Sequence, residues 1–168
     1  IGSSNLKPIN YKEDRGSAQC KSSVIFAGMR TNGLTSIYAK KSRNHTEVMC
    51  KNLKLPIKIN NKKNYDKIKI NKVNNIKTLN YQIPSDISSG AFFITLTALS
   101  ENSKLIIKNV NINLSRIGII TILKKMGVKI QFKNKKIYKG EKIADIKVES
   151  PKILKAIDCP SKYNSGAI

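Results

Sequence analysis

Hydrophobic and polar positions follow two different periods along the chain. Residues 18–29 carry apolar side chains at helical spacing. The expected buried face of that helix consists of Cys20, Val24 and Ala27. Residues 57–60 and 65–73 instead alternate lysine or asparagine with isoleucine, which is the period of strands that bury one face. The pattern therefore predicts a mixed α/β (α+β) fold.

Polar residues mark the ends of the elements in the first half. Ser17 is expected to cap the first helix, and a strand is expected over residues 34–39. Asn44 then precedes a second helix, with Glu47 three residues later as in a capping box. Pro56 ends that helix, and the two alternating strands follow.

The second half repeats this order of elements. A helix is expected to open at Pro84 and Asp86 and to run to Leu99, and Asn113 is expected to cap the next helix. Gly127 lies just after that helix, where a left-handed backbone is usual. The strands expected around these helices are residues 104–110, 128–132 and 143–148.

A sequence repeat accompanies this repeated order. Five positions recur after 76 residues: Pro84 and Pro160, Ser85 and Ser161, Ser89 and Ser165, Gly90 and Gly166, Ala91 and Ala167. Residues 16–19 are an earlier, weaker copy. Each complete copy is predicted to form a β-α-β-α-β-β unit. Because such a unit cannot cover its own helical face, the units are expected to belong to a larger closed structure.

The repeat divides the chain into two expected domains, residues 1–78 and 79–168. Residues 74–80 between them are mostly polar and are expected to form a mobile joint.

Composition narrows the function classes. The net charge of +22 comes almost entirely from lysines scattered among isoleucine and asparagine, with few arginines and only 6% aromatic residues. A nucleic-acid site would favour arginine and stacking aromatics, so we expect no nucleic-acid partner and attribute the lysines to solvated faces. Three widely spaced cysteines predict neither disulfides nor a zinc site. No apolar run could cross a membrane, and a cytoplasmic protein is expected.

Helix starts are the places where an anion could bind, because unpaired backbone N–H groups point there. Candidates are residues 17–19, residues 42–44 with the Arg43 guanidinium beside the Ser42 hydroxyl, and residues 85–86. Simple helix capping is the alternative at each, and the acidic Asp86 favours it. His45, the only histidine, lacks a nucleophile nearby in sequence, so a packing or hydrogen-bonding role is expected.

Three segments at these positions resemble the EPSP synthase family of the shikimate pathway. They are Gly16-Ser17-Ala18-Gln19-Cys20-Lys21-Ser22-Ser23, Ser42-Arg43-Asn44-His45-Thr46-Glu47-Val48-Met49 and Ile83-Pro84-Ser85-Asp86-Ile87-Ser88-Ser89-Gly90-Ala91-Phe92. The family's patterns are SAQ-x-KSA, S/T-R-D-H-T-E-x-M-L and P-G-D-x-S-S-A-A-F. Asn44 and Ser85 depart from the usual Asp and Gly, and the resemblance covers essentially the whole chain.

The resemblance implies a fold of six β-α-β-α-β-β units in two lobes. Residues 1–78 would be the last unit of the first lobe, and residues 79–168 the first unit of the second lobe with the start of the next. The family transfers the enolpyruvyl group of phosphoenolpyruvate to shikimate 3-phosphate without a cofactor. By this resemblance Ser17, Ala18, Gln19, Ser42 and Arg43 bind shikimate 3-phosphate, and Gln19 also lies near phosphoenolpyruvate.

The family's catalytic Asp would follow Ile168, and other ligands would precede Ile1. We therefore expect no catalytic residue, no metal site and no activity in the chain alone, which would work as a monomer with the rest of the same enzyme. Three alternatives stay open. They are a fragment of the sister enolpyruvyl transferase that acts on UDP-N-acetylglucosamine, a stand-alone anion-binding module derived from this fold, and a basic nucleic-acid binder.

Overall fold

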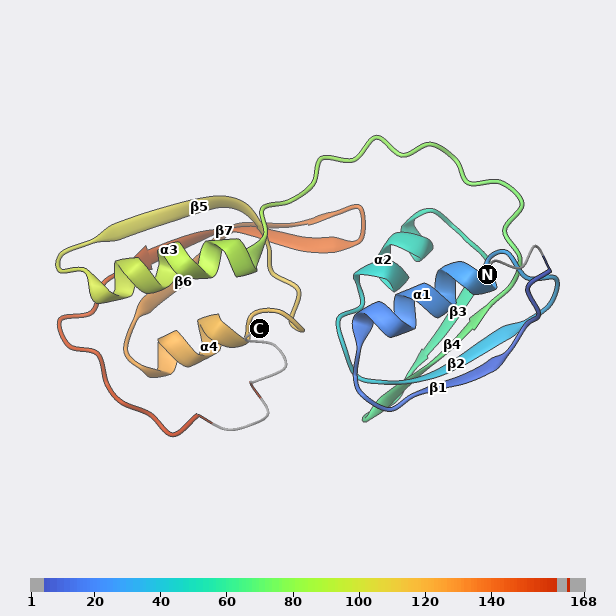
Figure 1. The fold of residues 1–168 in the computed structure, drawn as a ribbon. Helices are drawn as coiled ribbons and strands as arrows, with labels where there is room; N and C mark the ends of the chain where they lie inside the picture. Colours follow the sequence, from blue (N-terminus) through green and yellow to red (C-terminus); the bar gives the residue numbers. More distant parts are fainter. Residues whose placement is uncertain (1–4, 160–162, 164–168) are drawn as a thin grey trace. The chain divides into compact units, whose positions relative to one another are not determined.

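The chain folds into two compact units, Ile1–Asn80 and Tyr81–Ile168. The structure is a computed structural model, and it describes residues 5–159 and 163. The repeat positions at 160–161 and 165–167 lie outside the described residues. Mixed helices and strands in each unit confirm the predicted fold class (Figure 1).

Unit 1 places two helices on a four-stranded sheet (Figure 1). Its elements are β1 (Asn10–Glu13), α1 (Ala18–Gly28), β2 (Thr35–Lys40), α2 (His45–Asn52), β3 (Ile57–Asn61) and β4 (Tyr65–Ile70). The strand order is β1-β2-β4-β3, with β1 parallel to β2 and the other pairs antiparallel. The predicted strands and both predicted helices are present. The strand that enters the unit, β1, has no clear periodicity in the sequence.

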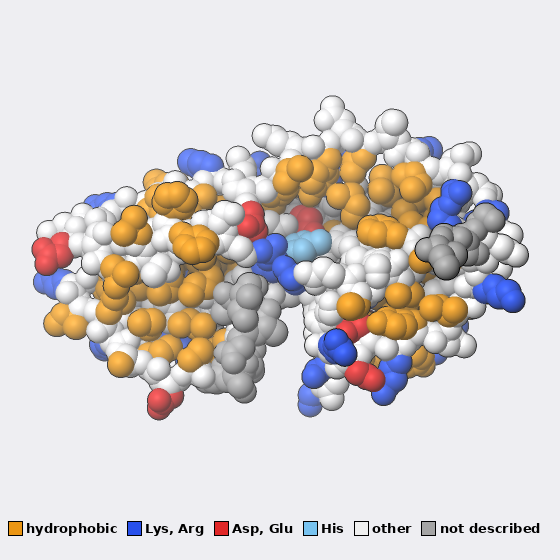
Figure 2. All heavy atoms as spheres, in the orientation of Figure 1, with side chains coloured by type: hydrophobic (Ala, Val, Ile, Leu, Met, Phe, Trp, Pro, Cys, Tyr) orange, Lys and Arg blue, Asp and Glu red, His pale blue; other side chains and the backbone are white. Residues whose placement is uncertain are grey.

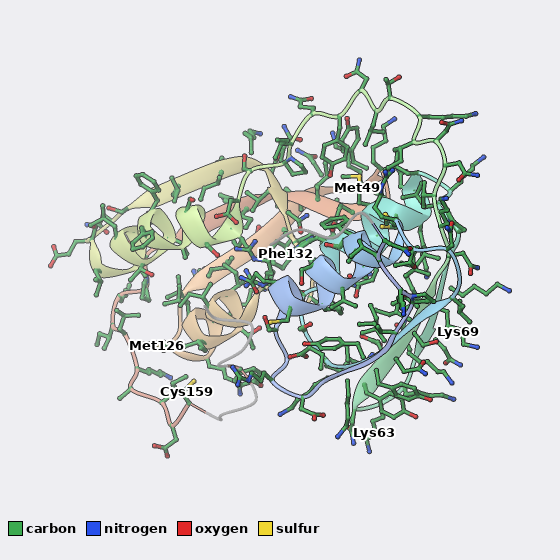
Figure 3. The ribbon with its side chains drawn as sticks, turned by 45° about the vertical axis from the view of Figure 1, so that its right-hand side comes forward. Met49, Lys63, Lys69, Met126, Phe132 and Cys159 are labelled. Carbon is green, nitrogen blue, oxygen red and sulfur yellow. The ribbon has the colours of Figure 1, made fainter. Side chains whose placement is uncertain are left out.

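The core of unit 1 lies between its helices and its sheet. Its buried members are Ile25, Met29, Ile37, Ala39, Cys50, Ile68, Ile70 and Val73. Alternation along β4 directs Ile68 and Ile70 inward, so Lys69 between them faces away from the core. Lys69 projects from β4 on the side of the sheet away from α1, and Lys63 lies in the turn of the β3–β4 hairpin (Figure 3).

The prediction of which residues α1 buries is wrong. The residues that α1 buries are Lys21, Ile25 and Gly28. Gly28 belongs to this face because a Cβ there would lie 2.6 Å from Ile70 Cγ2 and 3.0 Å from Thr35 Cβ. Lys21 belongs to it because its ammonium reaches the carboxylate of Glu47 on α2. The expected residues Cys20 and Ala27 are exposed, and Val24 is half-buried.

Unit 2 repeats the arrangement with one strand almost absent. Its elements are α3 (Ile87–Leu99), β5 (Lys104–Asn111), α4 (Gly118–Lys125), β6 (Lys129–Tyr138) and β7 (Glu141–Glu149). The antiparallel sheet has the order β5-β7-β6. In the place that β1 occupies in unit 1, Ser85 alone forms a parallel bridge to Val110 of β5. The Ser85 N–H donates to Asn109 O at 2.9 Å, and Asn111 N donates to Ser85 O at 3.0 Å.

The start of α4 differs from the prediction. Asn113 does not cap the helix, which begins five residues later at Gly118 with Ile117 as its N-cap residue. The Asn113 side chain instead accepts from the N–H and the hydroxyl of Ser115, at 3.0 and 2.8 Å. This local turn satisfies the Asn113 oxygen before the helix can form. Gly127 follows the helix with φ +98°, which confirms the predicted left-handed end.

Asp145 on β7 organises irregularities in both neighbouring strands. The register shifts between Ile107 and Val110 in β5 and between Lys133 and Lys136 in β6. Asp145 accepts hydrogen bonds from three groups: Asn109 N at 2.9 Å, Lys108 Nζ at 2.9 Å and Asn134 Nδ2 at 2.8 Å. Both asparagines have φ +50°, the left-handed conformation that Asn tolerates. One carboxylate therefore closes a β-bulge on each side of its strand.

Helix α3 presents large apolar side chains to the surface. They are Phe92 (79% exposed), Phe93 (62%), Leu96 (62%) and Leu99 (68%). Hydrophobic atoms are widespread over the face of unit 2 that carries α3 and α4 (Figure 2). Within the described residues, no helix is both long and apolar enough to cross a membrane.

Candidate functional site

The loop before α1 is held by a buried carboxylate. Glu13 ends β1 and is 3% exposed, and its two oxygens accept from Arg15 N at 2.9 Å and Gly16 N at 2.8 Å. Gly16 has φ +73°, a conformation that glycine adopts without strain. The Ser17 hydroxyl then accepts from Cys20 N at 3.2 Å, which confirms the predicted cap. The Ser17 oxygen therefore has a structural role in this loop.

The loop before α2 begins at the end of β2, next to β1. Because β1 and β2 are parallel, their carboxyl ends meet at one sheet edge, and the starts of α1 and α2 come together there. The predicted capping box is wrong: Asn44 makes no side-chain cap hydrogen bond. Its intended partner Glu47 instead binds Lys21, with Oε1 2.6 Å from Nζ. An unpaired buried ammonium would cost more free energy than an uncapped helix start, so Glu47 pairs with Lys21.

A surface pocket of about 240 Å³ lies between the two helix starts. Its lining consists of Ala18, Gln19, Ser22, Arg43, His45 and Thr46. The hydroxyls of Ser22 and Thr46 are 2.6 Å apart and join α1 to α2. The structure thus brings together three of the five predicted binding residues, Ala18, Gln19 and Arg43. Ser17 and Ser42 do not line the pocket.

Ser42 is adjacent to the pocket residue Arg43 and has an unusual oxygen. The Ser42 Oγ is buried and has no hydrogen-bond partner among the described residues. A buried hydroxyl without a protein partner costs free energy, so a ligand group that bonds to this oxygen would be stabilised.

Arg43 supplies the charge of the pocket. Its guanidinium makes no ion pair with any carboxylate in the described part of the chain, and the pocket lining contains no acidic residue. The dipoles of two helix starts add positive potential. The pocket can therefore bind an anion through the guanidinium and unpaired N–H groups.

Three pocket residues are missing from the sequence prediction: Ser22, His45 and Thr46. Ser22 lies one helical turn after Ala18, so the period of 3.6 residues was the available signal. His45 is the first residue of α2, and its ring contributes to the lining rather than to packing alone. Thr46 is the second residue of α2 and lies within the second segment that resembles the family, but no binding role was assigned to it there; its hydroxyl is 2.6 Å from that of Ser22.

At the helix starts of unit 2 the polar side chains bind one another. Asp86 caps α3 by accepting from Ser89 N at 3.0 Å, and its Oδ1 lies 3.0 Å from Nη2 of Arg116. Arg116 also donates to the Ser88 hydroxyl. Partial burial acts to raise the pKa of Asp86, but hydrogen bonds from Ser89 and Ser88 and the Arg116 charge hold it below its usual value. The interpretation of Asp86 as a cap is confirmed.

The described residues contain no group of three or more His, Cys, Asp or Glu side chains that could hold a metal ion. Burial, and secondarily the nearby Glu47 charge, raise the pKa of the Cys50 thiol to about 11, so this cysteine is a poor nucleophile or ligand. The chemistry that the pocket offers is anion binding.

Comparisons with known proteins converge on one family. A family model described as EPSP synthase (3-phosphoshikimate 1-carboxyvinyltransferase) matches residues 1–160. The 3-phosphoshikimate 1-carboxyvinyltransferase of Caldicellulosiruptor saccharolyticus is 41% identical over 150 residues, 89% of this chain and 34% of the relative. That of Hydrogenovibrio crunogenus is 38% identical over 160 residues, 94% of this chain and 36% of the relative.

A solved structure agrees with these relatives. EPSP synthase from Acinetobacter baumannii matches with a TM-score of 0.82 and 36% identity over 96% of this chain and 36% of that chain. The chain spans about a third of the length of the relatives that it matches.

Proposed function

Since this chain belongs to the EPSP synthase family, we propose that it forms part of a 3-phosphoshikimate 1-carboxyvinyltransferase and binds the phosphate of shikimate 3-phosphate in the pocket between α1 and α2. The observation that carries the proposal is the Arg43 guanidinium, which lines this pocket without a carboxylate partner in the described residues. The partnerless Ser42 oxygen beside it supports the same assignment.

The size of the pocket fits a phosphate group with part of a sugar-like ring. Sites that enclose drug-sized ligands start at about 300 Å³, and this pocket of about 240 Å³ is smaller. Ala18 and Gln19 offer the first-turn N–H groups of α1, and Arg43 and Ser42 supply the charged and hydroxyl donors. We assign Gln19 to the side nearer phosphoenolpyruvate, as the resemblance implies. The residues in this chain bind and orient substrate, and none is assigned a proton-transfer step.

The overall reaction follows from the family. The enolpyruvyl group of phosphoenolpyruvate passes to a hydroxyl of shikimate 3-phosphate and phosphate is released. The residues that perform this transfer would come from the rest of the same enzyme, which we expect to be a cytoplasmic monomer that needs no cofactor.

The test is an amide NMR titration of the chain with shikimate 3-phosphate. Half of a site should bind at roughly millimolar concentration, which corresponds to about −4 kcal/mol. Shifts are expected at residues 17–19 and 42–46. Arg43→Ala should weaken binding by about ten-fold or more, because a charge-assisted contact contributes about 1.5–3 kcal/mol. Arg30→Ala is the matched control, because Arg30 is an exposed arginine at the other end of α1.

Two results would reject the proposal. Shifts centred on the lysine-rich residues 133–142 would indicate general charge attraction. Equal responses to UDP-N-acetylglucosamine and to shikimate 3-phosphate would remove the substrate assignment and favour the sister enzyme or a general anion-binding module.

A further inference from the structure

Lys21 is a fully buried lysine on the first turns of α1. It is 0% exposed, and its Nζ lies 2.6 Å from Glu47 Oε1 and donates to the main-chain oxygen of Arg43 at 2.9 Å. One ammonium therefore ties α1 both to the first turn of α2 and to the loop residue before it. Because the ammonium has no exposed surface, it cannot touch a ligand in the pocket.

The fold itself does not require this ion pair. In unit 2, the residue four places after the N-cap of α3 is Gly90, which corresponds to Lys21 four places after Ser17. The residue three places after the N-cap of α4 is Ile120, which corresponds to Glu47. Unit 2 builds the same two-helix arrangement with a glycine and a 1%-exposed isoleucine. Replacing a buried ion pair by apolar residues is often neutral or stabilising, so another reason must keep the pair in unit 1.

The loop arginines show what that reason is. Arg116 of unit 2 is held through its guanidinium, by Asp86 and Ser88. Arg43 occupies the same place in unit 1, one residue before the N-cap of the second helix, but it is held through its backbone carbonyl by Lys21. The first arrangement neutralises the guanidinium. The second fixes the residue and leaves the guanidinium available.

We propose that Lys21 is a positioning residue of the phosphate pocket. Its ammonium fixes the backbone of Arg43 through the carbonyl oxygen, so the Arg43 guanidinium stays available to an anion and is not neutralised by a protein carboxylate. Glu47 offsets the Lys21 charge, so the pair adds little net field to the pocket. The role in ligand binding rests on the proposed function, whereas the role in fixing the loop can be measured without a ligand.

The decisive variant is the double substitution Lys21→Met with Glu47→Met. Both changes conserve side-chain volume approximately and leave no buried charge unpaired. In the ligand-free chain, amide hydrogen exchange at residues 43–46 should become about ten-fold faster or more, while residues of β2 and β4 keep their protection. The dissociation constant for shikimate 3-phosphate should rise by about ten-fold, although the Arg43 side chain is unchanged.

Lys12→Met is the matched control, because it removes an exposed lysine whose partner Asp14 is also exposed. It should change neither exchange nor binding. Unchanged exchange at residues 43–46 in the double variant would overturn the proposal whether or not the chain binds shikimate 3-phosphate. Loss of the folded state would also overturn it, because the pair would then be a requirement of the fold. If the original chain binds no shikimate 3-phosphate while exchange responds as expected, the proposed function fails and the positioning role of Lys21 stands.

Discussion

In both units a Ser-Arg pair precedes the second helix, Ser42-Arg43 before α2 and Ser115-Arg116 before α4. The first helix of each unit begins at the same edge, but its N-cap residue is Ser17 in unit 1 and Asp86 in unit 2. The acidic cap takes the arginine as an internal partner. The neutral cap leaves the arginine of unit 1 beside an open pocket. The neutral cap of unit 1 therefore accompanies an open pocket, and the acidic cap of unit 2 accompanies an ion pair with the corresponding arginine.

The cores differ at the opposite end of the first helix. Gly28 of α1 allows the helix to approach Thr35 and Ile70 closely, whereas the position corresponding to Gly28 on α3 is Thr97, eleven residues after the N-cap in both helices. At Gly28 the first helix of unit 1 therefore lies too close to its sheet for a side chain, so the residues of α1 and α3 are not interchangeable at this position.

The largest expected effect comes from copying Thr97 into unit 1. Gly28→Thr places a Cβ 2.6 Å from Ile70 Cγ2, which forces the helix and sheet apart. The free energy of unfolding of unit 1 should fall by about 1–3 kcal/mol. Denaturant titration followed through the amide signals of Ile37 and Ile68 measures it. Ser23→Thr on the exposed side of α1 is the control, and an equal effect of the two substitutions would show that contact at Gly28 is unimportant.

The second prediction concerns a substitution that removes the Asp86–Arg116 ion pair of unit 2 and makes its cap like that of unit 1. Asp86→Ser keeps a capping oxygen but removes the carboxylate that binds Arg116. We expect a loss of up to about 1 kcal/mol in stability from the missing ion pair and new shifts at Ser88 and Arg116 on titration with inorganic phosphate. Ser85→Ala is the control that keeps the carboxylate. If Asp86→Ser gains no phosphate response, then neutralisation of Arg116 is not what closes this site.

The third prediction concerns acid. Hydrogen bonds from Lys108, Asn109 N and Asn134 lower the pKa of Asp145 from 3.8 to about 2. Because the folded pKa lies below the unfolded one, this stabilisation is complete above the unfolded value and is lost as the pH falls through the folded value. Asp145→Asn should therefore flatten the fall in unfolding free energy between about pH 4 and pH 2. Asp158→Asn serves as an exposed control, and an unchanged slope for Asp145→Asn would contradict the assignment.

The smallest effect is expected from a change in the segment that joins the two units. Residues 74–80 form no helix or strand, and six of the seven are exposed. Inserting four Gly-Ser residues after Asn75 should change the unfolding free energy of each unit by less than about 0.5 kcal/mol. A larger loss in either unit, measured by amide exchange, would show that the two units stabilise one another and that the expected mobile joint is wrong.

The sequence predicts the parts of this fold that depend on local chemistry. Alternating isoleucines gave β3 and β4, and side-chain oxygens gave the caps at Ser17 and Asp86, because each signal acts within a few residues. Ser17, Ala18, Gln19, Ser42 and Arg43 were predicted through motif resemblance, and three of them line the pocket.

Two of the failures, the capping box and the buried face of α1, share a physical cause. Glu47 fits a capping box by spacing, but a buried lysine 26 residues earlier competes for its carboxylate. Cys20 and Val24 fit an apolar stripe, but Lys21 and Gly28 are buried because of contacts with other elements. Tertiary partners decided both cases, and local periodicity carries no information about them.

Asp145 has a consequence for the order of folding events. Its carboxylate joins β5 and β6 through β7, so its full set of hydrogen bonds is complete only after three strands have reached their final register. Contacts completed this late are absent from a transition state that is still assembling the sheet. Loss of the Asp145 carboxylate should therefore speed the unfolding of unit 2 and leave its folding rate nearly unchanged. The hydrogen bonds that Asp145 makes at the two bulges would then determine the unfolding rate of unit 2 and have little effect on its folding rate.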